Sequence, residues 1–412
     1  MASAPAWAEE ARRAAEESLA TLPALTGREE EWRFTPPAHL GLTGAEPDGA
    51  GPAAAAELPA VPAAERAARI AFLDGRPAGA PAASGLPEGV VVADLGDALS
   101  THGELLRERL YSLVGFDTRP GALNAARWEA GTFVYVPRGV TVELPVEALH
   151  SVSGAQGRVH GRTLVVADEG SRVTLVDRFA SSGGASGTPV HVSTVAEVFA
   201  GPGAVVDHYS FIGWDAGVRH HLQLTARIDR DARFRSMAVT LGGDVVRVEP
   251  TLVLAAPGGD GEALGLYFAA GDQHFEHRVV SRHEAPNAHS NLLYKGAIQD
   301  TAHTVFYGNL IVRPDAAGTD AYQTNRNLVL NEGARADTIP FLEIETAEVR
   351  CSHAGAVGRV DDEHLFYLES RGVPRDLAKR LIVFGFFQEV LQKFALEDLR
   401  EELEAAVAEK IR

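Results

Sequence analysis

Short extended segments separated by turns dominate the chain from about residue 89 to residue 349. Hydrophobic and polar residues alternate along these segments with the period of two that is typical of β-strands. The pattern is clearest at residues 132–137, 163–167, 172–176, 222–228, 305–312 and 327–330. We find no convincing helical pattern between about 150 and 350. The middle of the chain is therefore predicted to be β-structure.

Four turns in this region resemble one another. They are Glu169-Gly170-Ser171, Pro202-Gly203-Ala204, Arg230-Asp231-Ala232 and Glu332-Gly333-Ala334, and each precedes a short extended run. Three of them lie roughly 30 residues apart, which is the scale of repeat architectures. A β-sandwich also has regular turns. The pattern alone indicates a large all-β unit and allows a solenoid.

Both ends of the chain have helical patterns. Near the start, Trp7, Ala11, Ala15, Leu19 and Leu22 recur at helical spacing among charged residues. From about residue 44 onward the chain is mostly Ala, Pro and Gly. Such a segment has too few large apolar side chains to offset the entropy lost on ordering, so we expect a linker there.

Near the other end, Asp361 is a good N-cap for a helix over residues 362–371, and Gly372 is placed to end it. Pro374 suits the first turn of a second helix. That helix carries an apolar stripe at three- and four-residue spacing, made of Leu377, Leu381, Phe384, Phe387, Leu391 and Phe394. A last helix is apolar on one side and acidic on the other.

The single cysteine, Cys351, and the net charge of −18 exclude several classes of protein. One cysteine cannot form an intrachain disulfide, a zinc site with several thiolates, or a complete four-cysteine iron–sulfur site. The acidic balance argues against nucleic-acid binding. The start does not read as a secretory signal and no apolar run is long enough to span a membrane, so we expect a soluble cytoplasmic protein.

Common enzyme signatures are missing. None of the four lysines follows a glycine in a phosphate-loop pattern, and Gly-x-Ser-x-Gly and His-Glu-x-x-His do not occur. The acidic run Asp361-Asp362-Glu363 could serve a glycosidase, which needs two converging acids. It lies at a predicted helix start, where acids favour the helix dipole. The structural interpretation is preferred.

Histidines gather at 274, 277, 283, 289 and 303, with the pair His220-His221 upstream. Several imidazoles on one face could bind a metal ion. His274 and His277 differ by an odd number, however, so on a regular strand they point to opposite faces. Hydrogen-bonded or solvated histidines on successive strands are the favoured interpretation.

Cys351 and His353 are two residues apart at the boundary between the β region and the C-terminal helices. On an extended segment their side chains share a face. Thiolate and imidazole are both good ligands for iron or zinc. One alternative is an inert cysteine beside a surface histidine, and this interpretation is favoured when only these two residues are considered. Another is a Cys–His nucleophile pair, for which no third, orienting group is evident.

The region from His274 onward resembles the SufB/SufD family of iron–sulfur cluster assembly proteins. The resemblance rests on the order and spacing of residues 290–296, 319–330, 340–344, 349–358 and 365–372, which include the run Cys351-Ser352-His353. Residues 30–35 resemble the family's N-terminal region more weakly. The lack of additional cysteines, the length and the Trp32 motif are most like the SufD branch.

This resemblance implies a mainly β fold, with a right-handed parallel β-helix flanked by helical regions. Together with the patterns and composition described above, it leads us to expect an N-terminal helical region at 1–43, an Ala/Pro/Gly-rich linker at 44–88, a β-helix core at 89–350 and a C-terminal helical domain at 351–412. The resemblance also implies a non-catalytic scaffold that pairs with a SufB-type subunit. Two copies of the ATPase SufC would contact the C-terminal helices.

Within the resemblance, His353 matches the histidine implicated in building the cluster at the SufB–SufD interface. Cys351 matches the cysteine of the same motif. One cysteine cannot fill four iron coordination positions, so a transient iron–sulfur cluster would have to be shared with the partner subunit. The type of cluster and the binding of a flavin stay open.

Three alternatives remain at this point. Within the family, the chain could be a SufB-like scaffold that acts as a homodimer. A β-helix carbohydrate-active enzyme would instead bind oligosaccharides without needing an ATPase. A mononuclear metal enzyme would use the histidines between 274 and 303.

Overall fold

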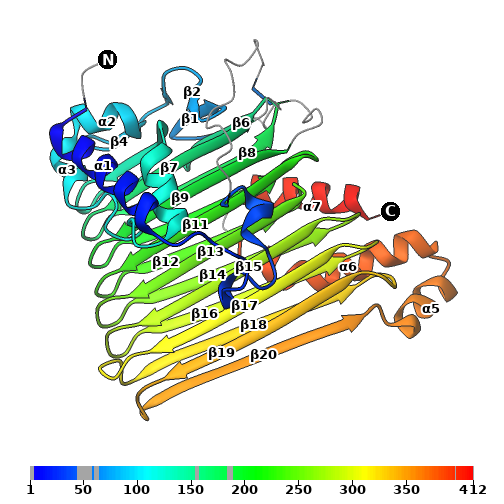
Figure 1. Cartoon of the computed structure of the whole chain (residues 1–412). Coiled ribbons are helices and arrows are strands. Elements are labelled where there is room, and N and C mark those ends of the chain that lie inside the picture. The colour runs from blue at the N-terminus through cyan, green and yellow to red at the C-terminus, as the bar shows by residue number, and fades with distance from the viewer. Residues whose placement is uncertain are drawn as a thin grey trace.

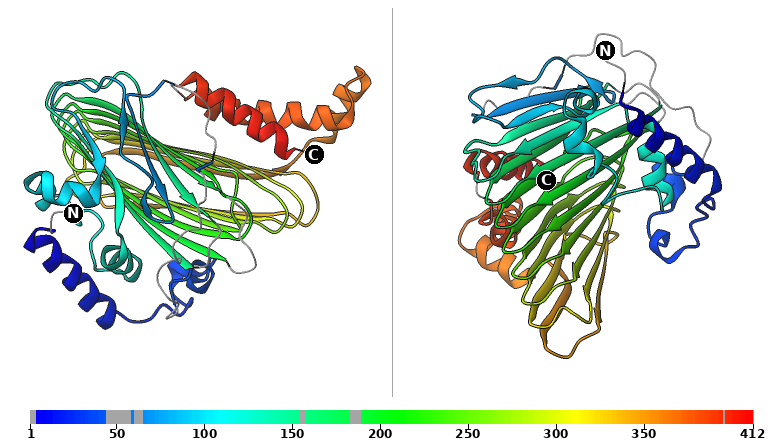
Figure 2. Two further views of the ribbon diagram at one scale, coloured as in Figure 1. Left: turned by 90° about the horizontal axis from the view of Figure 1, so that it is seen from above. Right: turned by 90° about the vertical axis from the view of Figure 1, so that its left-hand side faces the viewer.

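The computed structural model describes residues 4–43, 58–59, 65–153, 157–182, 189–394 and 396–411. Its centre is a β-solenoid in which the chain passes back and forth between two sheets (Figure 1). The N-terminal helices and the C-terminal helices lie on opposite outer faces of the solenoid (Figure 2, left). A mainly β fold with a parallel β-solenoid and helical regions at both ends confirms the predicted fold class.

Sheet A has eleven strands among the described residues, in the order β2-β1-β6-β8-β10-β12-β14-β16-β18-β20, with β3 paired to β1. From β6 onward neighbouring strands are parallel and in continuous register. The bounds are β1 Ala68–Leu73, β2 Arg76–Pro77, β3 Ala82–Ala83, β6 Val146–Val152, β8 Arg172–Ser181, β10 Val205–Gly213, β12 Arg233–Thr240, β14 Asp260–Ala269, β16 His289–Ile298, β18 Thr319–Val329 and β20 Val349–Arg359.

Sheet B has nine strands among the described residues, in the order β19-β17-β15-β13-β11-β9-β7-β5-β4. Only the β4–β5 pair is antiparallel among these neighbours. The bounds are β4 Val91–Asp94, β5 Ala130–Val136, β7 Gly157–Ala167, β9 Val190–Ala200, β11 Val218–Ile228, β13 Val245–Leu254, β15 His274–His283, β17 His303–Val312 and β19 Arg335–Ile344.

The alternating sequence pattern separates two hydrophobic layers. In β12, Phe234 and Ala238 belong to the core between the two sheets. Met237 and Val239, on the opposite face of the same strand, pack against the C-terminal helices. Because side chains alternate along a strand, one short segment serves both layers. This double burial explains why many strands contain few exposed residues.

The four turns predicted from the sequence occupy corners of the solenoid. Their central residues have positive φ, at 67° for Gly170, 66° for Gly203, 54° for Asp231 and 102° for Gly333. The N–H groups of the first three donate to a carbonyl of the following turn in the same column, at 2.9, 2.8 and 3.1 Å. The Gly333 turn lies at the opposite corner, between β18 and β19. The 30-residue spacing therefore reports one column of stacked turns.

Helices form the two flanking regions. On the N-terminal side they are α1 Ala6–Thr21, the short 3-10 helices η1 Glu30–Trp32 and η2 Pro37–Leu40, α2 Leu95–Thr101, α3 Gly103–Arg107 and α4 Arg119–Arg127. On the C-terminal side they are α5 Asp362–Ser370, α6 Arg375–Leu391 and α7 Glu397–Lys410. No helix of the described residues is long and apolar enough to cross a membrane.

The structure places further elements within two of the regions expected from the sequence and one strand across the last expected boundary. Strands β1 to β3 lie within 44–88, because Ala68–Leu73 alternates buried and half-buried side chains and extends sheet A. Helices α2 to α4 lie within 89–350, started by the caps Asp94 and Thr118. Strand β20 continues to Arg359, past the boundary at 351. The linker predicted at 44–57 and 60–64 falls outside the described residues.

Candidate functional site

The last coil leaves the solenoid open at one end. In the described residues β19 pairs within its sheet only with β17, and β20 only with β18. Each last strand therefore has one edge of backbone N–H and C=O groups without a neighbouring strand, which is a template for pairing with another chain. The solenoid narrows toward this end (Figure 2, right). We call β19 and β20 together the open end.

Cys351 and His353 both lie on β20 and share a face, as their spacing predicted. Cys351 pairs in register with Ala321, and His353 with Gln323. Cys351 packs against the core between the sheets, so this shared face is the inner one. Gln323 is fully buried, whereas His353 is exposed because no further coil covers it.

The environment of Cys351 keeps its thiol protonated. Burial raises the pKa of Cys351, and the Ala321 N–H, which donates a hydrogen bond to the sulfur, opposes this only in part. The carboxylate of Asp320 raises the pKa further. Among the described residues no hydrogen bond joins Cys351 to His353, so a preformed Cys–His nucleophile pair is not present. The sulfur becomes a strong ligand when a metal ion displaces its proton.

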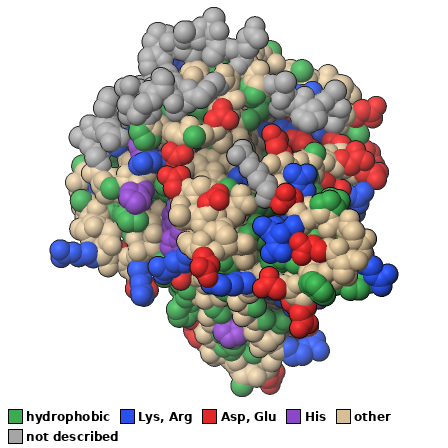
Figure 3. Space-filling view, turned by 90° about the vertical axis from the view of Figure 1, so that its right-hand side faces the viewer, with side chains coloured by type: hydrophobic (Ala, Val, Ile, Leu, Met, Phe, Trp, Pro, Cys, Tyr) green, Lys and Arg blue, Asp and Glu red, His purple; other side chains and the backbone are tan. Residues whose placement is uncertain are grey.

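Three exposed apolar side chains lie on the two strands of the open end, and the Phe341 ring among them points outward, toward Tyr307 of β17, with the ring centroids 5.1 Å apart. Phe341 is 45% exposed and Ile344 40% on β19, and Val357 is 46% exposed on β20. Hydrophobic side chains and a histidine are visible at the narrow end in Figure 3. These apolar residues were not predicted as part of the site, although the alternation of apolar residues in the last strands of a stack is a signal that sequence provides. Exposed apolar side chains beside an unpaired strand edge are typical of association sites.

Histidines inside the solenoid are structural. His277 and His283 point inward, and burial lowers the pKa of His277 to about 3 and that of His283 to about 4. His220 also lies inside, with Trp214 donating to its Nδ1 at 3.1 Å, whereas His221 meets Glu249 outside. These placements confirm the predicted alternation of faces.

Histidines on the outer face of sheet B have partners of their own. His274 Nε2 lies 2.7 Å from Thr35 Oγ1, and His303 Nε2 lies 2.7 Å from Asp337 Oδ2. On sheet A, His289 Nδ1 likewise lies 2.9 Å from Asp260 Oδ1 of β14. No group of three or more His, Cys, Asp or Glu side chains in the described part of the chain is arranged to hold a metal ion. The structural interpretation preferred from the sequence fits these contacts.

The acidic run at residues 361–363 starts a helix, as predicted. Asp361 Oδ1 accepts a hydrogen bond from the Glu363 N–H at 2.8 Å. Gly372 follows α5 with a φ of 85°, which matches its predicted role at the helix end. These acids are accounted for by the helix start.

The apolar stripe of α6 divides into two parts. Its C-terminal half, including Phe387 and Leu391, is buried against the outer face of sheet A. Its N-terminal half is open, with Leu377 47% exposed and Leu381 48% exposed. Helix α5 beside it exposes Phe366 at 71%. We call this exposed surface of α5 and α6 the helical face.

A buried lysine fixes α6 to the solenoid. Lys295 of β16 donates to the Phe386 carbonyl at 2.8 Å and pairs with Glu389 at 2.7 Å. The ammonium group is almost fully enclosed, so removing either partner would leave a buried charge poorly satisfied. The helical face is therefore held in a set position relative to sheet A.

Comparisons with known proteins agree with this architecture. Residues 150–386 match the family model described as "SUF system FeS cluster assembly, SufBD core domain". An iron–sulfur cluster assembly SufBD family protein of Mycobacterium bovis is 42% identical over 295 residues, which cover 69% of this chain and 70% of that protein.

Two further relatives extend the comparison. A SufBD family protein of Mycobacterium leprae is 39% identical over 302 residues, covering 71% of this chain and 75% of that protein. The iron–sulfur cluster assembly protein SufD of Bacillus subtilis is 28% identical over 330 residues, covering 79% of this chain and 75% of that protein. The matched family model includes both the open end and most of α6.

Proposed function

Since this chain belongs to the SufB/SufD family of the SUF iron–sulfur cluster assembly system and is SufD-like, we propose that it is a non-catalytic scaffold subunit of that system. In this proposal it pairs with a SufB-type subunit and is coupled to a SufC-type ATPase in the cytoplasm. The single observation that carries the proposal is the open end, where His353 and Cys351 lie beside unpaired strand edges and exposed apolar side chains.

The partner we propose for the open end is the end of another solenoid. Two exposed strand edges favour a partner that supplies strands, because backbone N–H and C=O groups are then satisfied across the junction. Phe341, Ile344 and Val357 would be buried by the same contact. A SufB-type subunit has this chemistry; a second copy of this chain would use the same surface when no such subunit is present.

The iron–sulfur cluster is the cargo of this junction. His353 and Cys351 supply at most two ligands, whereas a [2Fe–2S] or [4Fe–4S] cluster is held by about four protein ligands. We therefore propose that the partner subunit completes the site. His353 is the stronger candidate of the two, because its ring is exposed at the junction while the Cys351 thiol is half-buried and protonated.

The helical face is the surface we propose for the ATPase. Its apolar side chains lie outside the layer that packs on sheet A, so they are free to contact another protein. Lys295 transmits movement of α6 to β16, two strands before the open end in sheet A. ATP hydrolysis by the partner could thereby act mechanically on the junction.

Purification of the tagged full chain from its own cells tests the assembly. We expect a SufB-type subunit and a SufC-type ATPase to co-purify. Recovery of the chain with neither would contradict the proposed partners. An oligosaccharide-binding chain without these subunits would instead support the carbohydrate-active alternative.

Three variants then test the site within the complex. His353→Ala is expected to leave assembly intact and to lower the activity of iron–sulfur enzymes at least about tenfold in cells that depend on the variant. Cys351→Ala is expected to lower it less. His289→Ala is the matched control, because this histidine is exposed and already paired on β16. Equal activity of His353→Ala and His289→Ala would remove His353 from the site.

A further inference from the structure

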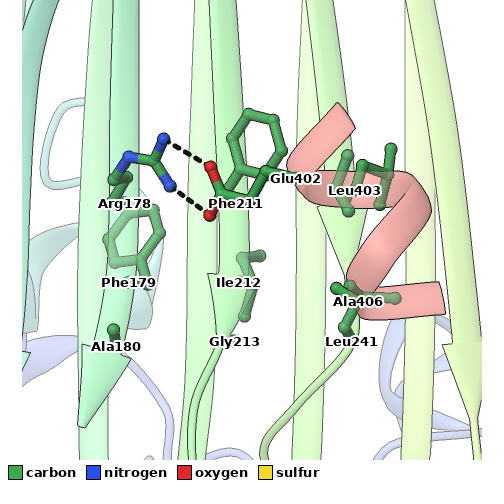
Figure 4. Close-up of a pocket in the computed structure, with 11 residues that line it drawn as sticks. Arg178, Phe179, Ala180, Phe211, Ile212, Gly213, Leu241, Glu402, Leu403 and Ala406 are labelled. Atoms are coloured by element: carbon green, nitrogen blue, oxygen red, sulfur yellow. Dashed lines mark hydrogen bonds and ion pairs between the residues drawn. The ribbon is translucent and has the colours of Figure 1, made fainter. Parts of the chain in front are cut away.

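A pocket separates helix α7 from the outer face of sheet A (Figure 4). Strands β8, β10 and β12 form its floor, and α7 forms its roof. Its volume is about 190 Å³. The lining residues are Arg178, Phe179, Ala180, Phe211, Ile212, Gly213, Val239, Leu241, Glu402, Leu403 and Ala406. We call it the α7 pocket.

Most of the α7 pocket is apolar. Phe211 comes from β10, Leu241 directly follows β12, and Leu403 and Ala406 come from the helix (Figure 4). Leu403 and Val407 of α7 are otherwise well packed in the layer between helix and sheet. The pocket is therefore a local gap in a hydrophobic interface. An apolar cavity of about 150 Å³ accepts benzene, so this volume suits one aromatic ring or a small fused pair.

One end of the pocket is polar and electrically balanced. Arg178 donates to the two carboxylate oxygens of Glu402 at 2.7 and 2.8 Å, and its Nε donates to Glu147 at 2.9 Å. The guanidinium lies over the Phe211 ring, 5.4 Å from its centroid. A guanidinium has five N–H groups and these contacts use three. Two N–H groups of Arg178 and further lone pairs of Glu402 are left to bind a ligand.

This balance selects the charge of the ligand. An anion that accepted from the remaining N–H groups of Arg178 would lie against the carboxylates of Glu402 and Glu147 or would have to displace one of them. A cation at the remaining lone pairs of Glu402 would lie against the Arg178 guanidinium or would have to displace it. Breaking a partly buried, bidentate pair leaves one charge poorly satisfied. An uncharged molecule avoids both losses, and its single polar group can use the remaining donors or lone pairs.

We propose that the α7 pocket binds a small uncharged aromatic molecule with one hydrogen-bonding group, of the size of phenol or indole. The ring packs against Phe211 and Leu241, and the polar group lies at the Arg178–Glu402 pair. Such a molecule contacts both α7 and sheet A, so it stabilises the docked position of α7. The site does not depend on the open end or on any partner subunit.

Indole is the probe that tests this proposal on the full chain. We expect saturable binding with intermolecular NMR contacts to the Ala406 methyl group, and a higher melting temperature in excess indole. Ala406→Phe fills the pocket and is expected to weaken binding at least about tenfold. Ala405→Phe is the matched control, because this neighbour is exposed on the same helix and its ring stays outside the pocket.

A second variant fills the pocket from the opposite wall. Gly213→Leu has room for its Cβ, which would meet only the Phe179 carbonyl at 3.8 Å. It is expected to weaken indole binding as Ala406→Phe does. Charged probes of the same size, benzoate and benzylammonium, are expected to bind at least about tenfold more weakly than indole. The proposal would be overturned if indole binding did not saturate or if the three probes bound with equal affinity. It would also be overturned if both filled variants bound indole as tightly as Ala405→Phe does.

Discussion

The two ends of the solenoid are built in opposite ways. At the first end the antiparallel strands β2 and β3 pair with β1, β4 turns back on β5, and helix α2 covers β5. At the open end β19 and β20 stop without any such cover among the described residues. Both ends belong to one parallel stack, so the difference does not come from the repeat itself. It comes from what the chain adds beyond the repeat.

Buried charge shows the same contrast. Near the first end, Arg162 and Glu197 are both fully enclosed and joined at 2.7 Å. At the open end the pairs lie in solvent, as for Arg350 and Asp320 at 3.1 Å. Enclosed pairs bind the flanking loops to the sheet, whereas exposed pairs add little stability. In the described part of the chain the first end is therefore covered and tied by enclosed ion pairs, whereas the open end, which we propose as the partner surface, is not. Three predictions test this comparison, the largest expected effect first.

Breaking the Arg162–Glu197 pair is expected to have the largest effect. Glu197 also accepts the N–H groups of Tyr111, Leu113 and Val114, so Arg162→Met leaves its charge buried without a cation. The free energy of unfolding is expected to fall by about 3–5 kcal/mol. Denaturant unfolding measures it. Arg138→Met, in the exposed pair with Glu169, is the control and is expected to change it by less than about 1 kcal/mol. Equal losses would show that the first end has no special stability.

A charge placed at the open end is expected to affect association and leave stability nearly unchanged. Phe341→Asp puts a carboxylate where a partner would bury the ring, and its affinity for a SufB-type subunit is expected to fall about 10- to 100-fold. Leu144→Asp is the control, because this exposed leucine lies near the first end. Size-exclusion chromatography and titration with the purified subunit measure the difference. If Leu144→Asp lost binding and Phe341→Asp did not, the partner would bind at the first end of the solenoid and the proposed junction would be wrong.

The smallest expected effect is on the pH dependence of the free energy of unfolding, which differs between the buried groups of the earlier and the later half of the solenoid. His277, buried in the later half, has a pKa lowered to about 3. The pKa of a histidine in the unfolded chain is about 6.5. Between that pH and about pH 3, only the unfolded chain takes up the proton. The free energy of unfolding therefore falls as the pH drops, by up to about 1.4 kcal/mol per pH unit. His277→Phe is expected to remove this contribution to the slope, while the contributions of the other histidines with lowered pKa values, His220, His274 and His283, remain. Unfolding midpoints at pH 7, 6 and 5 measure it, with exposed His364→Phe as the control.

The earlier half of the solenoid contains a buried carboxylate, Asp177, that affects stability in a lower pH range. Asp177 is buried between His150 and His208; burial alone would raise its pKa, but these hydrogen bonds hold it well below its ordinary value. Its contribution to stability is complete above its ordinary pKa and is lost only at lower pH. Hence His277→Phe changes the slope between pH 7 and 5 without interference from Asp177. An unchanged slope would mean that His277 is not kept neutral.

The repeat was predictable because its signals are local. Positive-φ residues such as Gly170 and Asp231 mark the corners, and alternating side chains mark the strands. Strand β1 escaped prediction because Ala68–Leu73 is a single short alternation inside a stretch of Ala, Pro and Gly. Helices α2 to α4 escaped as well, although the caps Asp94 and Thr118 were visible signals. Isolated elements lack the reinforcement that repetition provides.

The site was predictable only in part. The shared face of Cys351 and His353 follows from their spacing, and it holds in the structure. This face is exposed at the end of the solenoid because β20 is the last strand of its sheet. No local sequence pattern indicates which strand is the last. The exposed Phe341 and Val357 read as ordinary core residues in sequence, because exposure depends on the missing next coil. The α7 pocket joins residues more than 200 positions apart and had no signal at all.

The stacking of coils also sets the distance between the helical face and the junction. Helix α6 contacts β14 and β16, while the open end consists of β19 and β20, so a whole number of coils separates the helical face from the junction. Each added coil lengthens that separation by about 4.8 Å, the spacing between neighbouring strands. Inserting or deleting one complete coil before β18 would change the distance in a discrete step. The separation of the two proposed partners is thus counted in coils and cannot be tuned continuously.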